Sequence, residues 1–309
     1  MRTRTMHNPW LKLREGMNEE DYDLINGLQE RCIREDQTTL KLELDYKLAA
    51  RSSTERKGIG PINEFMYFDG QELIGYIGIC EFGGAGSPLE VNGMVHPEYR
   101  RQGVFGTLSK LVMDERRSRG SKSMLLLSDR KSEAGQAFIQ GTGANYHHSE
   151  HEMYLRTDWT GVHDNSTEDV TFRIATNADA REIQRQNAIY FGDDRVEEGT
   201  DEPESRMILP EEEAQRGMTI YLAEADGQVI GKVHIQLSSG IGGIYGLGVL
   251  PEHRGKGYGR AVLLRAIDRL KEAGARDIML QVVVENASAL RLYQTCGFVE
   301  TSTMDYYEL

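Results

Sequence analysis

Apolar and polar positions follow one pattern that occurs twice along the chain. Each occurrence begins with two apolar, strand-like runs on either side of an Asp-Gly pair, Asp69-Gly70 or Asp226-Gly227, as in a β-hairpin. The expected strands are 64–68 and 72–81 in the first copy, and 219–225 and 228–237 in the second. A Gly/Ser-rich loop then leads to a further strand, and these loops are 83–87 and 238–243.

Two amphipathic helices follow these strands. Apolar residues recur at helical spacing at Val104, Leu108, Leu111 and Val112 in the first copy, and at Leu263, Ala266, Ile267 and Leu270 in the second. We expect Gly274 to end the second helix, and Asn18 and Asn177 to cap an early helix in each copy. Apolar strands follow the two helices, at 124–127 and 278–284. This order of strand, helix and strand predicts an α/β fold.

The segments that open the two helices resemble each other residue by residue. Val95-His-Pro-Glu-Tyr-Arg-Arg-Gln-Gly103 and Val249-Leu-Pro-Glu-His-Arg-Gly-Lys-Gly257 lie half of the 309-residue chain apart. An internal repeat of this length indicates a duplicated unit. We therefore expect two tandem domains, 1–156 and 169–309, joined by the polar linker 157–168.

Composition and charge exclude several classes of protein. Acidic residues outnumber basic ones by 49 to 36, giving a net charge of −13, so nucleic acid is not an expected partner. No run of about 18 apolar residues predicts a membrane span, and Met1–Glu15 lacks the apolar core of a signal peptide. The three scattered cysteines suit neither a disulfide framework nor a zinc site. These features predict a cytoplasmic protein that has no membrane partner.

The second glycine motif predicts an anion site. Arg254-Gly-Lys-Gly-Tyr-Gly-Arg260 lies between a strand and a helix. The first amides of a helix lack intrahelical partners, and glycines let a phosphate approach the backbone closely. The spacing fits neither a P-loop, because Gly257 follows Lys256, nor the dinucleotide fingerprint Gly-x-Gly-x-x-Gly. The alternative is a glycine-rich turn with solvated bases.

The same segment resembles motif A of the GNAT superfamily of N-acetyltransferases, Arg/Gln-x-x-Gly-x-Gly/Ala. About 27 residues further on, Asn286-Ala-Ser-Ala-Leu-Arg-Leu-Tyr293-Gln-Thr-Cys-Gly297-Phe298 resembles motif B of that family. The resemblance covers 170–309 well and 10–155 more loosely. It implies two tandem GNAT-like domains of the α/β class, each with a twisted, splayed mixed sheet flanked by helices, and acetyl-CoA as cosubstrate.

Site residues follow from the resemblance. It implies that the pantetheine arm of acetyl-CoA pairs with Leu247, Gly248 and Val249, and that the pyrophosphate lies on the loop and helix start. The residues implied at the loop and helix start are Arg254, Gly255, Lys256, Gly257, Tyr258, Gly259 and Arg260, and Asn286 of motif B is expected beside them. Tyr293 takes the position of the acid that protonates the departing thiolate, unless it is only a packed helix aromatic.

The general base is left open by the sequence. Glu285 is the candidate, because it lies at the carboxyl end of a strand, where ligands of a sheet gather. Glu224 lies beside a hairpin turn, where a solvated role is expected. Glu90 lies on the equivalent strand of the first copy, which lacks the acid. A water relay, which many members of the family use, is the alternative to a carboxylate.

The first copy departs from the motifs. Ser132, Ile139 and Ala144 stand where the second copy has Asn286, Tyr293 and Phe298, and Ile139 cannot donate a proton. Phe105 replaces the last glycine of motif A, although a side chain there could turn aside at the helix start. We interpret the first copy as degenerate: it either binds CoA without turnover or only shapes its partner's cleft.

Two further clusters bear on ligands. His147-His-Ser-Glu-His-Glu152 could place ligands on one side of a strand, but it is one continuous segment, so we expect no metal site. Ten acids and two bases lie between Asp193 and Glu213, which indicates either a solvated surface or a rim that attracts a cationic acceptor.

The sequence therefore predicts an acetyl-CoA-dependent N-acetyltransferase that acts on the primary amine of a cationic small molecule or peptide. Two alternatives stay open: a CoA-binding regulatory protein without catalysis, and an acetyltransferase of a thiol-cofactor precursor. Neither the acceptor, the acyl chain length nor the oligomeric state can be derived from the sequence.

Overall fold

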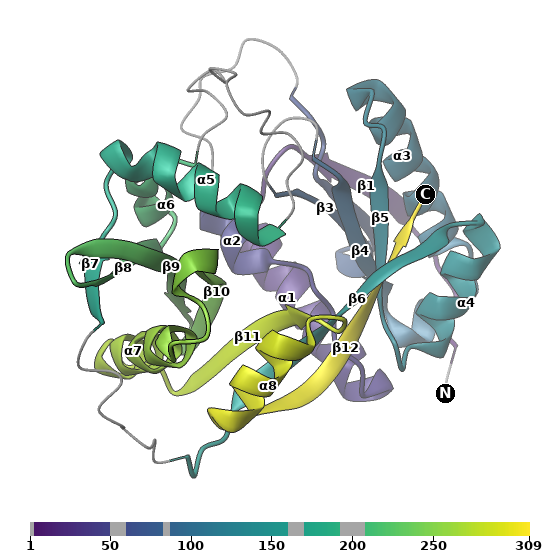
Figure 1. The fold of residues 1–309 in the computed structure, drawn as a ribbon. Helices are drawn as coiled ribbons and strands as arrows, with labels where there is room; N and C mark the ends of the chain where they lie inside the picture. The colour runs from purple at the N-terminus through teal and green to yellow at the C-terminus, as the bar shows by residue number, and fades with distance from the viewer. Residues whose placement is uncertain (1–2, 50–59, 83–86, 160–169, 192–207) are drawn as a thin grey trace. The chain divides into compact units, whose positions relative to one another are not determined.

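The structure is a computed structural model that describes residues 3–49, 60–82, 87–159, 170–191 and 208–309. These residues group into two compact units. The N-terminal unit comprises Met1–Ser149 together with Ser302–Leu309, and the C-terminal unit comprises Glu150–Thr301. Figure 1 traces the chain through both units. None of the described helices is both long and apolar enough to cross a bilayer.

The N-terminal unit is a mixed sheet with helices. Its strands are ordered β1-β2-β3-β4-β5-β12, with β4 and β5 parallel and the neighbouring pairs antiparallel. Its elements are β1 (Pro9–Arg14), α1 (Glu19–Asp36), α2 (Leu44–Ala49), β2 (Glu64–Asp69), β3 (Glu72–Glu81), β4 (Leu89–Val95), α3 (Val104–Arg119), β5 (Met124–Asp129) and α4 (Glu133–Thr142).

The C-terminal unit repeats this plan. Its strands are ordered β6-β11-β10-β9-β8-β7, with β10 and β11 parallel and the other pairs antiparallel. Its elements are β7 (Thr171–Ile174), α5 (Ala180–Phe191), α6 (Pro210–Gln215), β8 (Met218–Ala225), β9 (Gln228–Ser238), β10 (Ile241–Val249), α7 (Tyr258–Glu272), β11 (Asp277–Val283) and α8 (Ala287–Thr295).

Two long strands belong to both units, because the chain changes unit within each of them. β6 (Asn145–Leu155) leaves the N-terminal unit at Ser149, and its second half pairs with β11. β12 (Phe298–Glu308) leaves the C-terminal unit after Thr301, and its second half pairs with β5 from Met304 to Glu308. A repeat in sequence and a compact unit need not coincide when strands are exchanged. The boundaries 1–156, 157–168 and 169–309 therefore stay a prediction.

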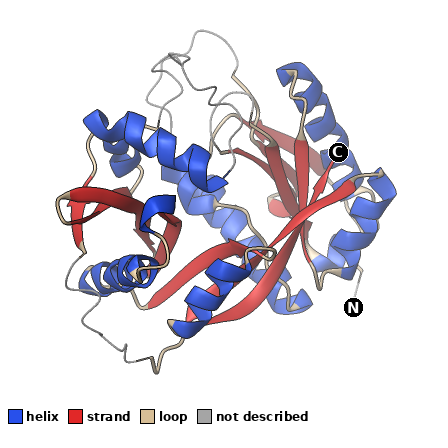
Figure 2. Ribbon diagram, viewed as in Figure 1, coloured by secondary structure: helices blue, strands red, loops and turns tan. Residues whose placement is uncertain are grey.

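Helices flank the strands (Figure 2), and each unit has more than one cluster of buried apolar side chains. In the N-terminal unit, α3 packs through Leu108 and α1 packs through Ile25, in separate buried clusters. In the C-terminal unit, Leu263 of α7 lies in the largest buried cluster, and Ile183 of α5 lies in another. Leu222 and Ala223, which are neighbours on β8, divide between these two clusters, as alternation along a strand requires.

The parallel strands of each sheet separate after a few residues. β10 pairs with β11 from Ile241 opposite Asp277 to Ile244 opposite Leu280, and that ladder ends although β10 continues to Val249. In the N-terminal unit, β4 and β5 pair only from Leu89 to Val91. The predicted α/β class with a splayed mixed sheet is confirmed. Beyond Ile244, no strand in the described part of the chain pairs with β10 on the side that β11 leaves.

Most predictions of local structure are confirmed, and two are wrong. Both hairpins, both amphipathic helices and the Asn18 cap are confirmed, since the Asn18 side chain accepts a hydrogen bond from the amide of Asp21. The cap at Asn177 is wrong, because Thr176 and Asp179 form a capping box and Asn177 bonds Glu211 instead. Much of the loop predicted at 238–243 is also wrong, because β10 begins at Ile241.

Candidate functional site

The site begins at a bulge in β10. Tyr245 pairs with His234 of β9 and Gly248 with Lys232, so Gly246 and Leu247 both stand opposite one residue of β9. Gly246 has a φ of 55°, in the left-handed region that glycine tolerates. The predicted pantetheine segment Leu247–Val249 thus lies where β10 has left β11. A Cβ at Gly248 would collide with the ring of Tyr190 from α5.

The glycine loop leads from β10 into α7. Gly255 and Gly257 have φ values of 74° and 84°, and Gly257 is the N-cap of α7 with no side-chain cap. A Cβ on either glycine would point into open space. The start of α7 therefore has amides to offer an anion at the positive end of the helix dipole.

The predicted phosphate-binding side chains surround this helix start. Arg254 is exposed, and its Nε donates to the carbonyl of Val249 at 2.9 Å, which fixes the guanidinium beside the loop. Lys256 is exposed, whereas Arg260 is half-buried and donates to the sulfur of Cys296 at 3.3 Å. Tyr258 packs against the core, and Gly259 lies beside Leu292 of α8. The structure brings the predicted loop residues together at one helix N-terminus.

Tyr293 lies in α8 with its ring in the buried core, edge-on to Phe298 with centroids 6.2 Å apart. Burial raises the pKa of its phenol to about 12, so the proton is retained at neutral pH. Among the described residues, its hydroxyl has no hydrogen-bond partner. The ring is therefore a packed aromatic, as the alternative expected, and it also carries an unused donor.

The two neighbouring predictions in motif B differ in outcome. Asn286 is the N-cap of α8, and its side chain accepts a hydrogen bond from the amide of Ala289 at 3.1 Å. This contact gives Asn286 a structural role whether or not it contacts a cofactor. Glu285 lies just beyond β11, exposed, and the structure gives it no buried contact with Tyr293. Its assignment as base stays a prediction.

The N-terminal copy has the same backbone with different chemistry. Gly103 caps α3 at a φ of 82°, and Arg100 donates to the carbonyl of Val95 at 3.1 Å, matching Gly257 and Arg254. Ser132 caps α4, as Asn286 caps α8, but the buried Ile139 stands in place of Tyr293. The prediction that this copy lacks a proton donor at that position is consistent with its side chains.

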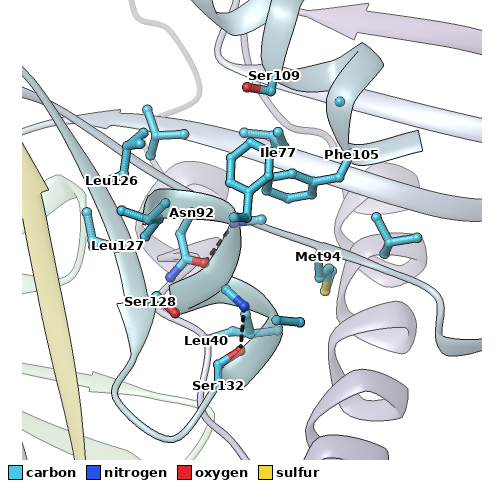
Figure 3. A pocket seen from close by; sticks show the side chains of 18 of the residues that line it. Leu40, Ile77, Asn92, Met94, Phe105, Ser109, Leu126, Leu127, Ser128 and Ser132 are labelled. Atoms are coloured by element: carbon cyan, nitrogen blue, oxygen red, sulfur yellow. Dashed lines mark hydrogen bonds between the residues drawn. The ribbon is translucent and has the colours of Figure 1, made fainter. Parts of the chain in front are cut away.

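A cavity of about 1000 Å³ lies in the N-terminal unit, between β4, β5, α3 and α4 (Figure 3). Apolar side chains such as Ile77, Leu126 and Phe105 dominate its lining, and Asn92 and Ser132 are among its polar members. Phe105 does not turn away from this space. It packs edge-on against Phe138 of α4, with centroids 4.6 Å apart, so two aromatic rings stand where the other copy has Gly259 and Leu292.

The remaining candidates lie elsewhere. Most of the acidic run, including Glu197, Glu198, Asp201, Glu202 and Glu204, falls outside the described residues, as does most of the linker. Glu224 forms an ion pair with Arg173 at 2.9 Å, and Glu90 lies 4.0 Å from Lys41. The described residues hold no group of three His, Cys, Asp or Glu side chains suited to a metal.

Sequence reasoning missed Lys232 and His234 of β9. Lys232 is fully buried beside the bulge of β10, and its Nζ lies 3.2 Å from Nε2 of His234. A signal was present in the sequence: Lys232 and His234 alternate with the apolar Val233 and Ile235, so a lysine and a histidine share one face of the strand.

Known proteins resemble this chain in sequence. The model of the GNAT acetyltransferase family matches residues 183–298. A mycothiol acetyltransferase from Thermobispora bispora is 28% identical over 81% of this chain and 90% of its own length. A second one, from Paenarthrobacter aurescens, is 28% identical over 75% of this chain and 73% of its own length.

Solved structures show the same fold. A GCN5-related N-acetyltransferase from Sphaerobacter thermophilus has a TM-score of 0.73 at 18% identity, over 99% of this chain and 96% of its own. A tandem GNAT protein from the clavulanic acid biosynthesis pathway has a TM-score of 0.68 at 14% identity, over 98% of both chains. With motif A at the free end of β10 and motif B in α8, the chain is identified as an acyltransferase whose residues 183–298 match the GNAT acetyltransferase family, and as a whole it resembles mycothiol acetyltransferases in sequence and tandem GNAT proteins in fold.

Proposed function

We propose that the C-terminal unit transfers the acetyl group of acetyl-CoA to a primary amine. The observation that carries this proposal is that the free end of β10 leads directly into the glycine loop and the start of α7. The free end of β10 runs into an uncapped α7 that begins at Gly257, and Tyr293 offers a free phenol from α8. An arm that binds along Leu247–Val249 would reach the helix start with its phosphates. This is the arrangement that a CoA thioester requires.

The chain's own residues then have separate tasks. Bound acetyl-CoA would supply an activated acetyl group as a thioester. Backbone groups at the bulge are available to hold its arm and polarise its carbonyl. Arg254, Lys256 and the amides at the start of α7 would hold the phosphates. Tyr293 would give its proton to the departing sulfur, since burial keeps the phenol protonated.

The N-terminal unit has no counterpart to Tyr293, so we assign it no turnover. Its cavity is lined in part by Arg100, Gly103 and Phe105 of the first motif A, which supports ligand binding there without chemistry. The competing function is a regulatory protein that binds CoA in both units and transfers nothing. Turnover separates the two readings, because only the enzyme releases free CoA thiol in the presence of an amine.

The acceptor is proposed as a small cationic amine. The acidic run 193–213 supports this choice from sequence alone, because clustered acids attract cations. The second candidate is the amine of a thiol-cofactor precursor. It is favoured because the mycothiol acetyltransferases from Thermobispora bispora and Paenarthrobacter aurescens match most of this chain.

An acceptor screen tests both proposals. The whole protein is incubated with acetyl-CoA and a panel of amines, neutral, cationic and acidic, together with precursors of thiol cofactors, and released thiol is followed with a dye. Transfer to a cationic amine, weakened by salt and by changing Glu197, Glu198, Asp201 and Glu202 to Gln or Asn, supports the acceptor class. CoA binding without thiol release across the panel would favour the regulatory function.

A further inference from the structure

Lys232 is an unusual side chain in the C-terminal unit, because it is fully buried without an acidic partner among the described residues. Its Nζ donates to the carbonyl of Gly246 at 3.1 Å and lies 3.2 Å from Nε2 of His234. The same Nζ lies over the rings of Tyr190 and Phe191, 5.5 and 5.7 Å from their centroids. A carbonyl oxygen, an imidazole nitrogen and two aromatic faces therefore surround this nitrogen.

The N-terminal unit shows how a buried lysine is ordinarily held. Lys47 of α2 lies 3.0 Å from the carboxylate of Glu64 and 3.0 Å from the hydroxyl of Tyr76. Lys47 thus has a carboxylate partner inside the fold. Lys232 has no equivalent of Glu64 in the described part of the chain, so its burial does not serve an ion pair.

Within the described ranges, three titratable groups face Lys232. On β9 there is His234, on α5 there is Tyr190, and on β10 there is Tyr245, which stands opposite His234. The strand β8 presents Ile220 and Leu222 to this face of the sheet. Tyr190 gives its hydroxyl proton to Gln186, so it is already engaged. His234 is thus the group in hydrogen-bond range that can exchange a proton with Lys232.

The position of this pair relates it to the proposed reaction. Lys232 stands opposite Gly248, and its Nζ bonds Gly246, so it spans the bulge that precedes the free end of β10. A Cβ at Gly246 would lie 3.2 Å from Nζ, which leaves glycine as the residue that fits both the bulge and the lysine. His234 keeps some exposed surface, whereas Lys232 has none.

We propose that Lys232 and His234 form the proton-accepting pair that converts the acceptor's ammonium into a nucleophilic amine. The proposal rests on the proposed acetyl transfer. The ammonium gives a proton to Nδ1 of His234, the N–H bond at Nε2 breaks, and that proton bonds to neutral Nζ of Lys232. His234 ends neutral in its other tautomer, and Lys232 ends as an ammonium. The free amine then forms the new C–N bond as the C–S bond breaks, Tyr293 protonates the thiolate, and the second proton that leaves the amine nitrogen passes through solvent to restore the Tyr293 phenol.

The surroundings suit both states of Lys232. After the transfer, its ammonium donates to Gly246 and to the bare Nε2 of His234, and the two rings stabilise the charge. Burial lowers the pKa of Lys232 to about 7 and lowers that of His234 well below 6.5, so neither group is fixed in its charged form at neutral pH. The strand β10 carries no carboxylate that could act instead.

Lys232→Met tests the pair, because methionine keeps most of the length and none of the basicity. The control is Lys110→Met, which changes an exposed lysine of α3. We expect kcat/KM for the best acceptor to fall about 100-fold or more in Lys232→Met, as for loss of a general base, and to stay unchanged in Lys110→Met. CoA affinity, measured by calorimetry, should be the same in both variants, which checks that the site is folded.

A second acceptor distinguishes proton transfer from packing. An analogue fluorinated beside its amine is unprotonated at the assay pH and needs no base to become a nucleophile. We expect Lys232→Met and His234→Gln to lose activity with the ordinary amine and keep most of it with the analogue, and added methylamine to restore part of the loss in Lys232→Met. Equal loss with both acceptors and no rescue would overturn the pair while leaving the acetyltransferase intact. A wild-type protein that binds CoA but acetylates neither amine would instead refute the proposed function, and the pair with it.

Discussion

Arg100 and Arg254 make the same hydrogen bond in the two units, each from Nε to the carbonyl of the valine five residues earlier, at 3.1 and 2.9 Å. They differ in what the rest of the guanidinium does. Arg100 forms a two-pronged ion pair with Asp36, at 2.7 and 2.6 Å, whereas Arg254 has no carboxylate partner among the described residues. The repeat has therefore kept the arginine in both copies, and only the second leaves its charge available to a phosphate.

This difference predicts unequal CoA binding by the two units. Arg254→Ala should weaken the tighter CoA-binding event about tenfold, or about 1.4 kcal/mol, by removing a charge-assisted contact to phosphate. Arg100→Ala should leave that event unchanged, because Asp36 already neutralises Arg100. Calorimetric titration with CoA measures both. A larger loss in Arg100→Ala than in Arg254→Ala would place the tighter site in the N-terminal unit.

The glycine that caps α7 gives a second prediction about the same site. Gly257 has a φ of 84°, and a side chain there would project into the open space in front of the helix. Gly257→Val should reduce CoA binding beyond what Arg254→Ala does, because it adds backbone strain and fills the place of a phosphate. Gly103→Val is the matched control at a φ of 82° in the other unit. The anion site would be wrong if Gly257→Val bound CoA as tightly as the wild type.

We predict that removing the phenol of Tyr293 lowers turnover without weakening CoA binding. Tyr293→Phe keeps the ring in the core and removes a hydroxyl that has no partner in the described structure, so folding and CoA affinity should hold. Turnover should fall about 100-fold, as for loss of a general acid. Tyr221→Phe, at another tyrosine packed against the same core, controls for loss of a phenol. Undiminished turnover in Tyr293→Phe would make solvent the proton source.

Short-range features of the fold could be predicted from the sequence. The Asp-Gly turns, the helical stripes and the repeated motif are local patterns, and the hairpins β2–β3 and β8–β9 and the helices α3 and α7 follow them closely. The predicted cap at Asn177 is wrong because the capping box is formed one residue earlier, between Thr176 and the acidic residue three positions after it, Asp179. The loop at 238–243 failed because Gly242 is needed inside β10, where a Cβ would press on Leu270.

Features that depend on distant pairing could not be predicted. The strand β12 pairs with β5, which lies some 175 residues earlier in the chain, as Met304 opposite Asp129 shows, and local sequence patterns do not specify such a partner. The ion pair of Arg100 with Asp36 joins residues 64 apart, so the sequence could not show that this arginine is neutralised. The burial of Lys232 could not be predicted either, because it depends on the bulge in β10 and on the packing of α5, which are distant from Lys232 in the sequence.

The burial of Lys232 makes a last prediction, which concerns stability and does not require activity. Burial lowers its pKa to about 7 in the folded protein, from the 10.5 that a lysine has when unfolded. Between pH 7 and about 10.5 the unfolded chain therefore binds more protons, and this group makes stability rise with pH. Below pH 7 the lysine is charged in both states, and the folded state bears the whole penalty of the buried charge.

Lys232→Met removes that penalty. At about 1.4 kcal/mol per pKa unit, the variant should be more stable than the wild type at pH 6 by an amount on the order of a few kcal/mol. The advantage should shrink as the pH approaches 10, where the wild-type lysine is neutral in the folded state and increasingly neutral in the unfolded state. Denaturant unfolding of the wild type, Lys232→Met and Lys110→Met at pH 6, 8 and 10 measures this difference, and other titrating groups cancel in the comparison. A difference that does not change with pH would mean that Lys232 titrates normally in the folded protein, and it could not then serve as a neutral proton acceptor at pH 7.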